Sequence, residues 1–306
     1  RARYETILKQ PQTLDSPPPP PAEVPPLAPI TPPAEPTPPP PPITMPTCYE
    51  RLVPSAYQTI QAAIDAACEG DTVTITPGTY VEGIVIMKNN LTVRGSEAEK
   101  VILSPLGKAG IILGAGVKLF TADNLVLSMD NAHEGVQALP TAPEKITLKN
   151  LVIKNATTGI ILGGVSGTFI VERLVIIESK ALGIHDRVTD AGIVMVQNNT
   201  LVENDIGYYL DTNSGKHTLV NNSITTSDTV GVAVSATGSN QEYNILGVSY
   251  TNVWGSGTNN YYSYRSAVAF TPYGTGNVSI TPGFITSADY HLDSTSSLIN
   301  AGDPAF

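Results

Sequence analysis

Apolar and polar residues alternate in short blocks through residues 71–280, and the blocks recur at a fixed interval. Glycine marks the interval, with a spacing of 24 residues between successive members of the set Gly135, Gly159, Gly183, Gly207 and Gly231. Apolar triplets recur between them, at 151–153, 174–176 and 200–202. A unit of this size, made of short strands, can bury its apolar positions only against its neighbours. The pattern therefore predicts an all-β solenoid.

The solenoid is predicted to be a parallel β-helix. Leucine-rich repeats have a similar length, but here the recurring residues are Ile, Val, Leu and Thr, and no amphipathic helical stretch separates the units. About nine or ten coils fit between residue 71 and the C-terminal region, which at about 4.8 Å per coil gives a stack of roughly 45 Å. Both open ends of such a stack need covers.

A helix over residues 55–69 is the predicted N-terminal cover. Ser55 and Gln58 have the spacing of a capping box, and Ile60 and Ile64 follow on one face. Residues 245–306, which are rich in tyrosine, are the predicted C-terminal cap region.

The chain before the solenoid has a different composition. Residues 1–10 have a pattern compatible with a short helix, which Pro11 would end. Half of the residues from Pro11 to Pro46 are proline, so residues 11–47 are predicted to form a polyproline II stalk or linker. A contact between this stalk and a neighbouring subunit would make the protein a homo-oligomer. The β-helix domain is then residues 48–306.

Charge and cysteine content narrow the classes of partner. The formal net charge is -10, and only 14% of the residues are charged, which argues against nucleic acid or an anionic membrane surface as a partner. No apolar run reaches the 18 or so residues of a membrane span, so no membrane insertion is predicted. The two cysteines, Cys48 and Cys68, are predicted to form a disulfide between the stalk and the capping helix.

Two segments resemble a known superfamily. The stretch YQTIQAAIDAACEGDTVTITPGTYVEGIVIMKNNLTVRG (57–95) resembles the opening of right-handed parallel β-helix proteins of the pectin-lyase-like kind. DYHLDSTSSLINAGDP (289–304) is similar to the closing segment of secreted members. The resemblance implies a right-handed helix and an extracellular or cell-surface location. The superfamily contains polysaccharide enzymes, adhesins and structural proteins, and the catalytic signatures of pectin methylesterases, polygalacturonases and alginate epimerases are missing.

One repeat carries unusual polar residues. Three repeats place Leu162, Leu210 and Val234 three positions after the glycine, whereas the repeat GIHDR (183–187) places Asp186 there. Strand alternation predicts that His185 and Arg187 point outward, beside Tyr209 and Asp211 of the next coil. Because a buried, unpaired Asp is costly, Asp186 is predicted to sit at a local bulge, hydrogen-bonded or in contact with water.

These residues have two interpretations. Uronate lyases and epimerases must neutralise a carboxylate and move a proton, which His, Arg and Tyr side chains can do, so His185, Asp186, Arg187, Tyr209 and Asp211 are the candidate catalytic residues. The alternative is a structural wall with an Arg187–Asp211 ion pair. A calcium ion held by Asp186, Asp190, Asp205 and Asp211 is the less favoured option, because nothing resembles a dense ligand loop, and no cofactor is expected.

A second group of candidates is aromatic and lies near the C-terminus. It consists of Tyr250, Trp254, Tyr261, Tyr262 and Tyr264. These side chains would either stack on sugar rings or cover the second open end of the solenoid. The favoured interpretation is an extracellular structural or adhesive surface protein, as a subunit of a larger assembly or filament, that contacts a glycan or cell-surface polysaccharide. The alternative is a polysaccharide lyase or epimerase that acts on uronate-containing glycans through His185, Arg187 and Tyr209.

Overall fold

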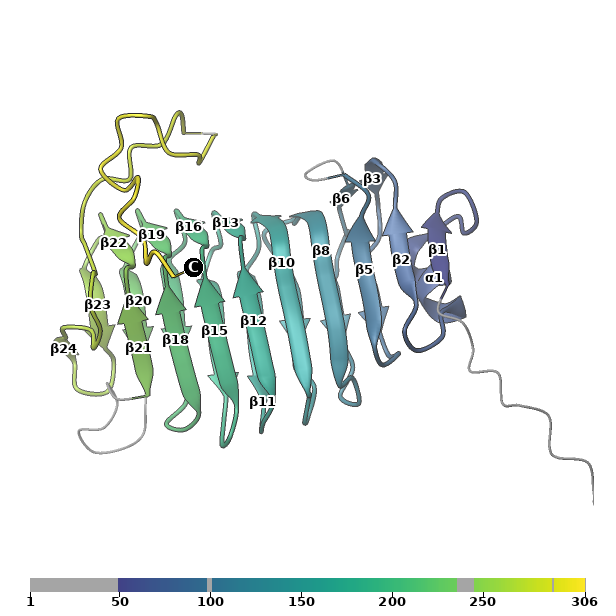
Figure 1. Ribbon diagram of the computed structural model, residues 1–306, viewed down its shortest axis with the longest axis horizontal. Helices are drawn as coiled ribbons and strands as arrows, with labels where there is room; N and C mark the ends of the chain where they lie inside the picture. Colours follow the sequence, from purple (N-terminus) through teal and green to yellow (C-terminus); the bar gives the residue numbers. More distant parts are fainter. Residues whose placement is uncertain (1–48, 98–100, 236–244, 288, 306) are drawn as a thin grey trace, which may run out of the picture. The chain divides into compact units, whose positions relative to one another are not determined.

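The computed structural model describes residues 49–97, 101–235, 245–287 and 289–305. All of them belong to one compact unit, Met45–Phe306. Within this unit the strands pair almost entirely in parallel and stack coil upon coil, as Figure 1 shows, so the predicted parallel β-helix is confirmed. The predicted segments 1–10 and 11–47, and with them Cys48, lie outside the described residues.

Each coil contributes strands to three faces. Face 1 contains β1 (Glu50–Val53), β2 (Thr72–Ile75), β5 (Leu91–Gly95), β8 (Leu119–Ser128), β10 (Lys145–Lys154), β12 (Thr168–Glu172), β15 (Ile193–Gln197), β18 (Lys216–Val220) and β21 (Leu246–Ser249). Face 2 contains β3 (Gly78–Tyr80), β6 (Val101–Leu103), the second halves of β8 and β10, β13 (Val175–Ile177), β16 (Thr200–Val202), β19 (Ser223–Thr225) and β22 (Asn252–Trp254).

Face 3 is a separate sheet. In most coils its strand either contains the repeating glycine or begins directly after it. The sheet contains β4 (Ile84–Ile86), β7 (Ile111–Leu113), β9 (Val136–Ala138), β11 (Thr158–Gly164), β14 (Leu182–Val188), β17 (Ile206–Leu210), β20 (Val230–Val234), β23 (Asn259–Ser263) and the antiparallel β24 (Val268–Ala269). Since β24 is antiparallel, this face has eight parallel strands. The β-helix therefore has about eight coils, fewer than the nine or ten predicted.

The equally spaced glycines stack in one column, as predicted. The reason is a close approach between coils: a Cβ added at Gly159 would lie 2.5 Å from the carbonyl oxygen of Gly183, and one at Gly183 would lie 2.4 Å from that of Gly207. No side chain fits at these distances. Glycine therefore recurs at each coil because the backbone of the next coil occupies the place of a side chain.

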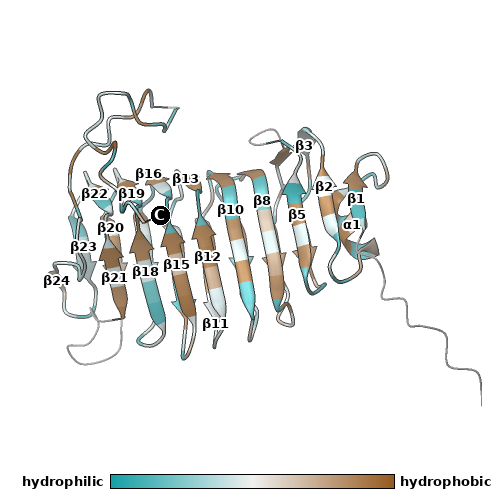
Figure 2. Cartoon of the chain, in the orientation of Figure 1, coloured by the Kyte–Doolittle hydropathy of each residue, from teal (hydrophilic) through white to brown (hydrophobic). Residues whose placement is uncertain are grey.

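The interior of the coils is filled by stacked aliphatic residues. On face 3 the inward column includes Ile160, Ile184 and Val232, all fully buried. Figure 2 shows that hydrophobic residues are concentrated in the strands of face 1, but β18 is hydrophilic over much of its length, whereas its neighbours β15 and β21 are largely hydrophobic. This hydrophilic strand lies beside the buried polar group described below.

The N-terminal end is covered by a helix shorter than predicted. Helix α1 spans Ile60–Ala66, and Ile60, Ala63 and Ile64 are buried against the first coils. The predicted capping box at Ser55 and Gln58 is wrong. The N-cap is Thr59, whose hydroxyl accepts from the backbone N–H of Ala62, and the carboxylate of Glu82 accepts from the N–H groups of Ile60 and Gln61. The first coil, not the helix itself, supplies this second cap.

The C-terminal region covers the other end and then turns back. Phe270 packs edge-to-face on Tyr261 of β23, with ring centroids 5.7 Å apart. Residues 280–287 and 289–305, here called the C-terminal arm, then run back along face 2 (yellow in Figure 1). The arm is fastened at its end by a hydrogen bond from the backbone N–H of Asp303 to the side-chain oxygen of Asn221 (2.7 Å).

Candidate functional site

Face 3 carries a continuous row of aromatic rings on its outer surface. The row begins at His185 on β14, whose ring stacks on Tyr209 of β17 with centroids 5.3 Å apart and planes 26° apart. Tyr209 meets the edge of Tyr264 (5.9 Å), and Tyr264 meets the edge of Tyr262 on β23 (5.2 Å). These four residues are called the aromatic strip. The strip crosses four successive coils along the axis of the stack.

A small residue in the middle of the strip lets the rings meet. Ala233 of β20 occupies the outward position between Tyr209 and Tyr262, yet it is fully buried. It belongs to a small hydrophobic cluster outside the main core, together with Ile206 and Val230. The tyrosine rings close over Ala233 and so bridge the coil that contributes no aromatic residue. The strip therefore rests on an apolar bed of its own.

His185 is held in a fixed orientation and favours its neutral form. Its Nε2 lies 3.3 Å from a carboxylate oxygen of Asp211. Burial lowers the pKa of His185 below the ordinary value, and the nearby Asp211 carboxylate only partly offsets this effect. A neutral imidazole with one nitrogen on a carboxylate can act as a base or offer its flat face to a ligand.

Arg187 occupies the next outward position, at the edge of a shallow hollow. The hollow has a volume of about 320 Å³, and Leu139, Pro140, Gly163 and Val165 line it along with Arg187. Among the described residues Arg187 has no ion-pair partner, so the predicted Arg187–Asp211 pair is wrong, and Asp211 contacts His185 instead. The guanidinium remains exposed beside the aromatic strip.

Asp186 is not part of this outer surface, and the predicted bulge is absent. Its register is regular, with Leu162 and Leu210 as neighbours on either side, so it points inward. It is fully buried and hydrogen-bonded, accepting from the Tyr208 hydroxyl (2.6 Å) and the Val188 backbone N–H (3.1 Å). Its carboxylate also lies 2.7 Å from Nδ1 of His217 on β18. Asp186 is therefore a core residue rather than a candidate catalytic residue.

His217 is the cationic partner of this buried group. Its other ring nitrogen lies 2.9 Å from the backbone carbonyl oxygen of Ser214, so both nitrogens face acceptors, an arrangement that favours the doubly protonated ring. Burial opposes the charge, but the hydrogen bond to Asp186, the charge of Asp186 and the Ser214 carbonyl outweigh it and raise the pKa of His217. Burial, followed by the charge of Asp186, also raises the pKa of Tyr208.

The late aromatic residues divide among three locations. Tyr262 and Tyr264 belong to the aromatic strip together with His185 and Tyr209, whereas the sequence pattern places them in a separate group. Tyr261 points inward and packs against the core and Phe270, as the end-covering interpretation predicted. Tyr250 and Trp254 lie elsewhere, Tyr250 at a turn beside face 2 and Trp254 on face 2 itself.

Metal and thiol chemistry find little support in the described part of the chain. Within it, no group of three or more His, Cys, Asp or Glu side chains is arranged to hold a metal ion. The four Asp residues considered for calcium are not one set, since Asp186 points into the core and Asp211 points outward. Cys68 is exposed, and its predicted partner Cys48 is outside the described residues, so that pairing stays a prediction. None of the described helices is long and apolar enough to cross a membrane.

Comparison with protein families places the chain in a known class. Residues 81–247 match the family described as "Right handed beta helix region", which is more than half of the chain. The protein therefore belongs to the right-handed β-helix family, and its fold is of the pectin-lyase-like kind that the opening segment resembles. No curated protein matches the chain.

Solved structures share the fold at low sequence identity. The PL6-family alginate lyase AlyGC is 14% identical with a TM-score of 0.49, and a point mutant of it gives 0.50; each match covers 76% of this chain and 40% of the lyase. A pectin methylesterase in complex with a hexasaccharide is 12% identical, with a TM-score of 0.40, 81% of this chain covered and 93% of the esterase. The chain thus spans well under half of the lyase, and these likenesses concern the fold alone.

Proposed function

We propose that this protein binds a glycan along the aromatic strip of face 3. The observation that carries the proposal is the unbroken row of rings from His185 through Tyr209 and Tyr264 to Tyr262. Aromatic faces and edges attract the polarised C–H groups of sugar rings, and tyrosine adds a hydroxyl for hydrogen bonding. A row of rings along the coil axis suits an extended ligand with a repeating unit.

The polar residues beside the strip add hydrogen-bonding and charged groups. Arg187 is exposed on one side, and the Asp211 carboxylate is fixed by His185. Planar polar groups around an aromatic platform supply direction, while the rings supply contact area. The Pro-rich segment that precedes the helix in the sequence fits an extracellular structural or adhesive surface protein, and this location and role are part of the proposal.

A polysaccharide lyase or epimerase is the second candidate function. It is favoured by one observation: His185 is held neutral by burial, next to the Tyr209 ring and one residue before the exposed Arg187. A neutral imidazole is a suitable proton acceptor, and a guanidinium neutralises a carboxylate. Asp186 takes no part in this mechanism, because it lies in the core.

Glycan arrays with the full chain test the binding proposal. The Tyr209→Ala and Tyr264→Ala variants remove central rings of the strip, and each is expected to weaken glycan binding by roughly tenfold or more, as loss of a central aromatic contact does at other binding surfaces. Tyr273→Ala is the matched control, because Tyr273 is a 72% exposed tyrosine that belongs to no ring pair in the strip. Equal binding by all three variants would exclude the strip as the site.

The enzymatic candidate has its own test. A lyase that acts on uronate polymers releases an unsaturated product that absorbs ultraviolet light, and His185→Ala should abolish that signal while Tyr273→Ala keeps it. Absence of product from alginate and pectate, together with strip-dependent binding, would leave the binding function alone.

A further inference from the structure

A second groove lies on face 2, beneath the C-terminal arm and away from the aromatic strip. Its two connected parts have volumes of about 250 and 670 Å³ and share the residues Asn198, Thr200 and Tyr290. Together they run from β10 to β22, which is four coil steps, or about 19 Å at the ordinary strand spacing. This surface is called the arm groove. The turns of the coils line one side of it, and the C-terminal arm lines the other.

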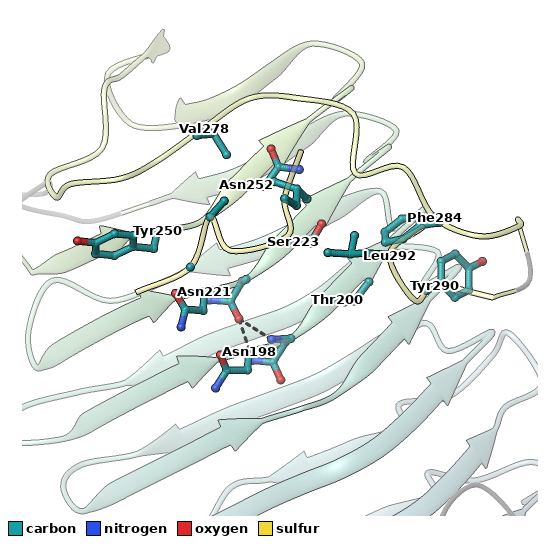
Figure 3. A pocket seen from close by; sticks show the side chains of 15 residues that line it. Asn198, Thr200, Asn221, Ser223, Tyr250, Asn252, Val278, Phe284, Tyr290 and Leu292 are labelled. Carbon is teal, nitrogen blue, oxygen red and sulfur yellow. Dashed lines mark hydrogen bonds between the residues drawn. The ribbon is translucent and has the colours of Figure 1, made fainter. Parts of the chain in front are cut away.

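Polar and aromatic side chains face each other across the arm groove. Figure 3 shows Asn198 and Asn221 at the turns on one side, Phe284 and Tyr290 of the arm on the other, and Thr200 and Ser223 between them. The rings of Phe284 and Tyr290 are fixed edge-to-face, with centroids 5.4 Å apart. The Tyr290 ring is therefore positioned by the arm rather than loose.

Two polar groups in the groove lack a partner. The Ser223 hydroxyl is buried and has no hydrogen-bond partner, although it lines the groove. The Asn198 side chain is exposed and makes no hydrogen bond with any described residue. A buried hydroxyl without a partner is unfavourable. A ligand that carries hydroxyl groups at the coil spacing would satisfy both side chains.

The charges around the groove favour an uncharged ligand. The charged or titratable residues that line one part are Lys154, Arg173, Asp289 and His291. Arg173 is already held by Asn150 and Glu172, and His291 Nδ1 lies 2.6 Å from the Asp289 carboxylate. On the opposite side the carboxylates of Glu203 and Glu178 are close enough to Tyr290 to add to the effect of burial, which raises the pKa of its hydroxyl. Neither sign of charge dominates, so a strongly anionic or cationic ligand would meet repulsion from one side.

From these contacts we infer that the arm groove binds a short, neutral, linear saccharide. One sugar ring lies on Tyr290, and hydroxyl groups of the saccharide bond to the amide of Asn198 and the hydroxyl of Ser223. The inference does not depend on the aromatic strip. If both surfaces bind glycans, two chains are held on different faces of one β-helix, and the protein links them.

The test uses the full chain and a set of neutral hexasaccharides: cellohexaose, laminarihexaose, mannohexaose and xylohexaose. Binding is measured by isothermal titration calorimetry for wild type, Tyr290→Ala, Tyr290→Phe and Asn198→Gly. Asn198 has a positive φ of 56°, so glycine removes the amide without straining the backbone. The strip variant Tyr264→Ala and the exposed control Tyr273→Ala complete the set, and thermal midpoints verify that each variant is folded.

At least one hexasaccharide is expected to bind, and Tyr290→Ala and Asn198→Gly should each weaken that binding by about tenfold. Tyr290→Phe keeps the ring and should stay within about threefold of wild type, as should the control Tyr273→Ala. Two results would overturn the inference: no hexasaccharide binds the wild-type chain, or binding is lost in Tyr264→Ala and kept in both groove variants. The second result would leave the aromatic strip as the site of glycan contact.

Discussion

Replacing Asp186 with leucine is expected to destabilise the protein strongly, even though leucine is the residue found at this position in the neighbouring coils. Asp186 is fully buried and accepts from Tyr208 and Val188, and His217 lies 2.7 Å from it. In Asp186→Leu the Tyr208 hydroxyl and His217 Nδ1 stay in the core without partners.

The loss of stability in Asp186→Leu can be estimated from the buried polar groups that lose their partner, which are the Tyr208 hydroxyl and the His217 ring. Removing one partner of a buried ion pair costs about 3–5 kcal/mol, because the other charge loses its compensation. The triple variant Asp186→Leu, Tyr208→Phe, His217→Leu replaces all three side chains with apolar ones and leaves the Val188 N–H without its acceptor, at a cost of about 1–3 kcal/mol. The Ser214 carbonyl oxygen loses His217 but still accepts from the Thr212 hydroxyl. The triple variant should therefore be more stable than the single one.

Urea denaturation followed by circular dichroism measures these differences. Asp211→Leu is the control, since this carboxylate lies one coil away on the outer surface and its contact with His185 is partly exposed, so the loss should be about 0–1 kcal/mol. The account of the buried group is refuted if Asp186→Leu unfolds within about 1 kcal/mol of wild type, or if the triple variant is less stable than the single variant.

The same group makes stability depend on pH. The pKa of His217 is raised in the folded protein, so the folded state holds its proton more tightly than the unfolded state, whose value is about 6.5. This contribution is fully present below about pH 6.5 and is lost as pH rises through the folded pKa. The stability difference between wild type and Asp186→Leu should therefore be larger at about pH 6 than at about pH 9, and an equal difference at both would argue against a charged His217.

Three further predictions concern the histidines, the glycine column and the helix cap. An NMR titration should find the His185 pKa below and the His217 pKa above the ordinary value of about 6.5; shifts in the same direction would contradict the two environments. Gly183→Ala places a Cβ 2.4 Å from the Gly207 carbonyl oxygen and should lower the free energy of unfolding by about 1–3 kcal/mol, measured by urea denaturation. Gly116→Ala is the control, because nothing lies within 4 Å of the added atom, and it should cost less than about 1 kcal/mol. Similar losses of stability in both variants would rule out close coil approach as the reason for the glycines. Glu82→Ala removes the acceptor of two N–H groups of α1 and should lower stability by about 0.5–2 kcal/mol, while an unchanged unfolding midpoint would show that the Thr59 cap is sufficient.

The solenoid was predictable because its repeat is local and regular. The spacing of Gly159, Gly183 and Gly207 reports the coil length directly, and strand alternation then assigns His185 and Tyr209 to one outward face. The N-cap was mispredicted at Ser55, although the actual N-cap, Thr59, is also local; the partner that the helix's own sequence lacks is Glu82, which comes from the first coil and caps two N–H groups of α1. A local pattern contains no sign of such a partner.

The location of Asp186 was mispredicted for a related reason. Burial of a carboxylate was judged too costly, but its partners stand 22 and 31 residues further along, at Tyr208 and His217. Both occupy columns that are otherwise apolar: Ile184 precedes Tyr208, and Val194 precedes His217 in register. When the repeats of the sequence are aligned coil by coil, Asp186, Tyr208 and His217 stand out as three polar residues in neighbouring columns of apolar residues. That alignment could have predicted the buried group.

Aligning the repeats of the sequence does not predict that the aromatic strip is continuous. Tyr209 and Tyr262 are two coils apart, and their rings meet through Tyr264 because Ala233 leaves room between them. The sequence identified His185 and Tyr209 as one group and Tyr262 and Tyr264 as another. Only the packing of rings over the small residue joins the two groups into one surface.

A crystal structure of the full chain with the saccharide that binds best on the array would show whether a glycan lies along the aromatic strip. Sugar rings are expected over Tyr209 and Tyr264, with the saccharide running along the coil axis and Arg187 beside one end. A bound saccharide that leaves all four rings of the strip untouched would contradict the proposal.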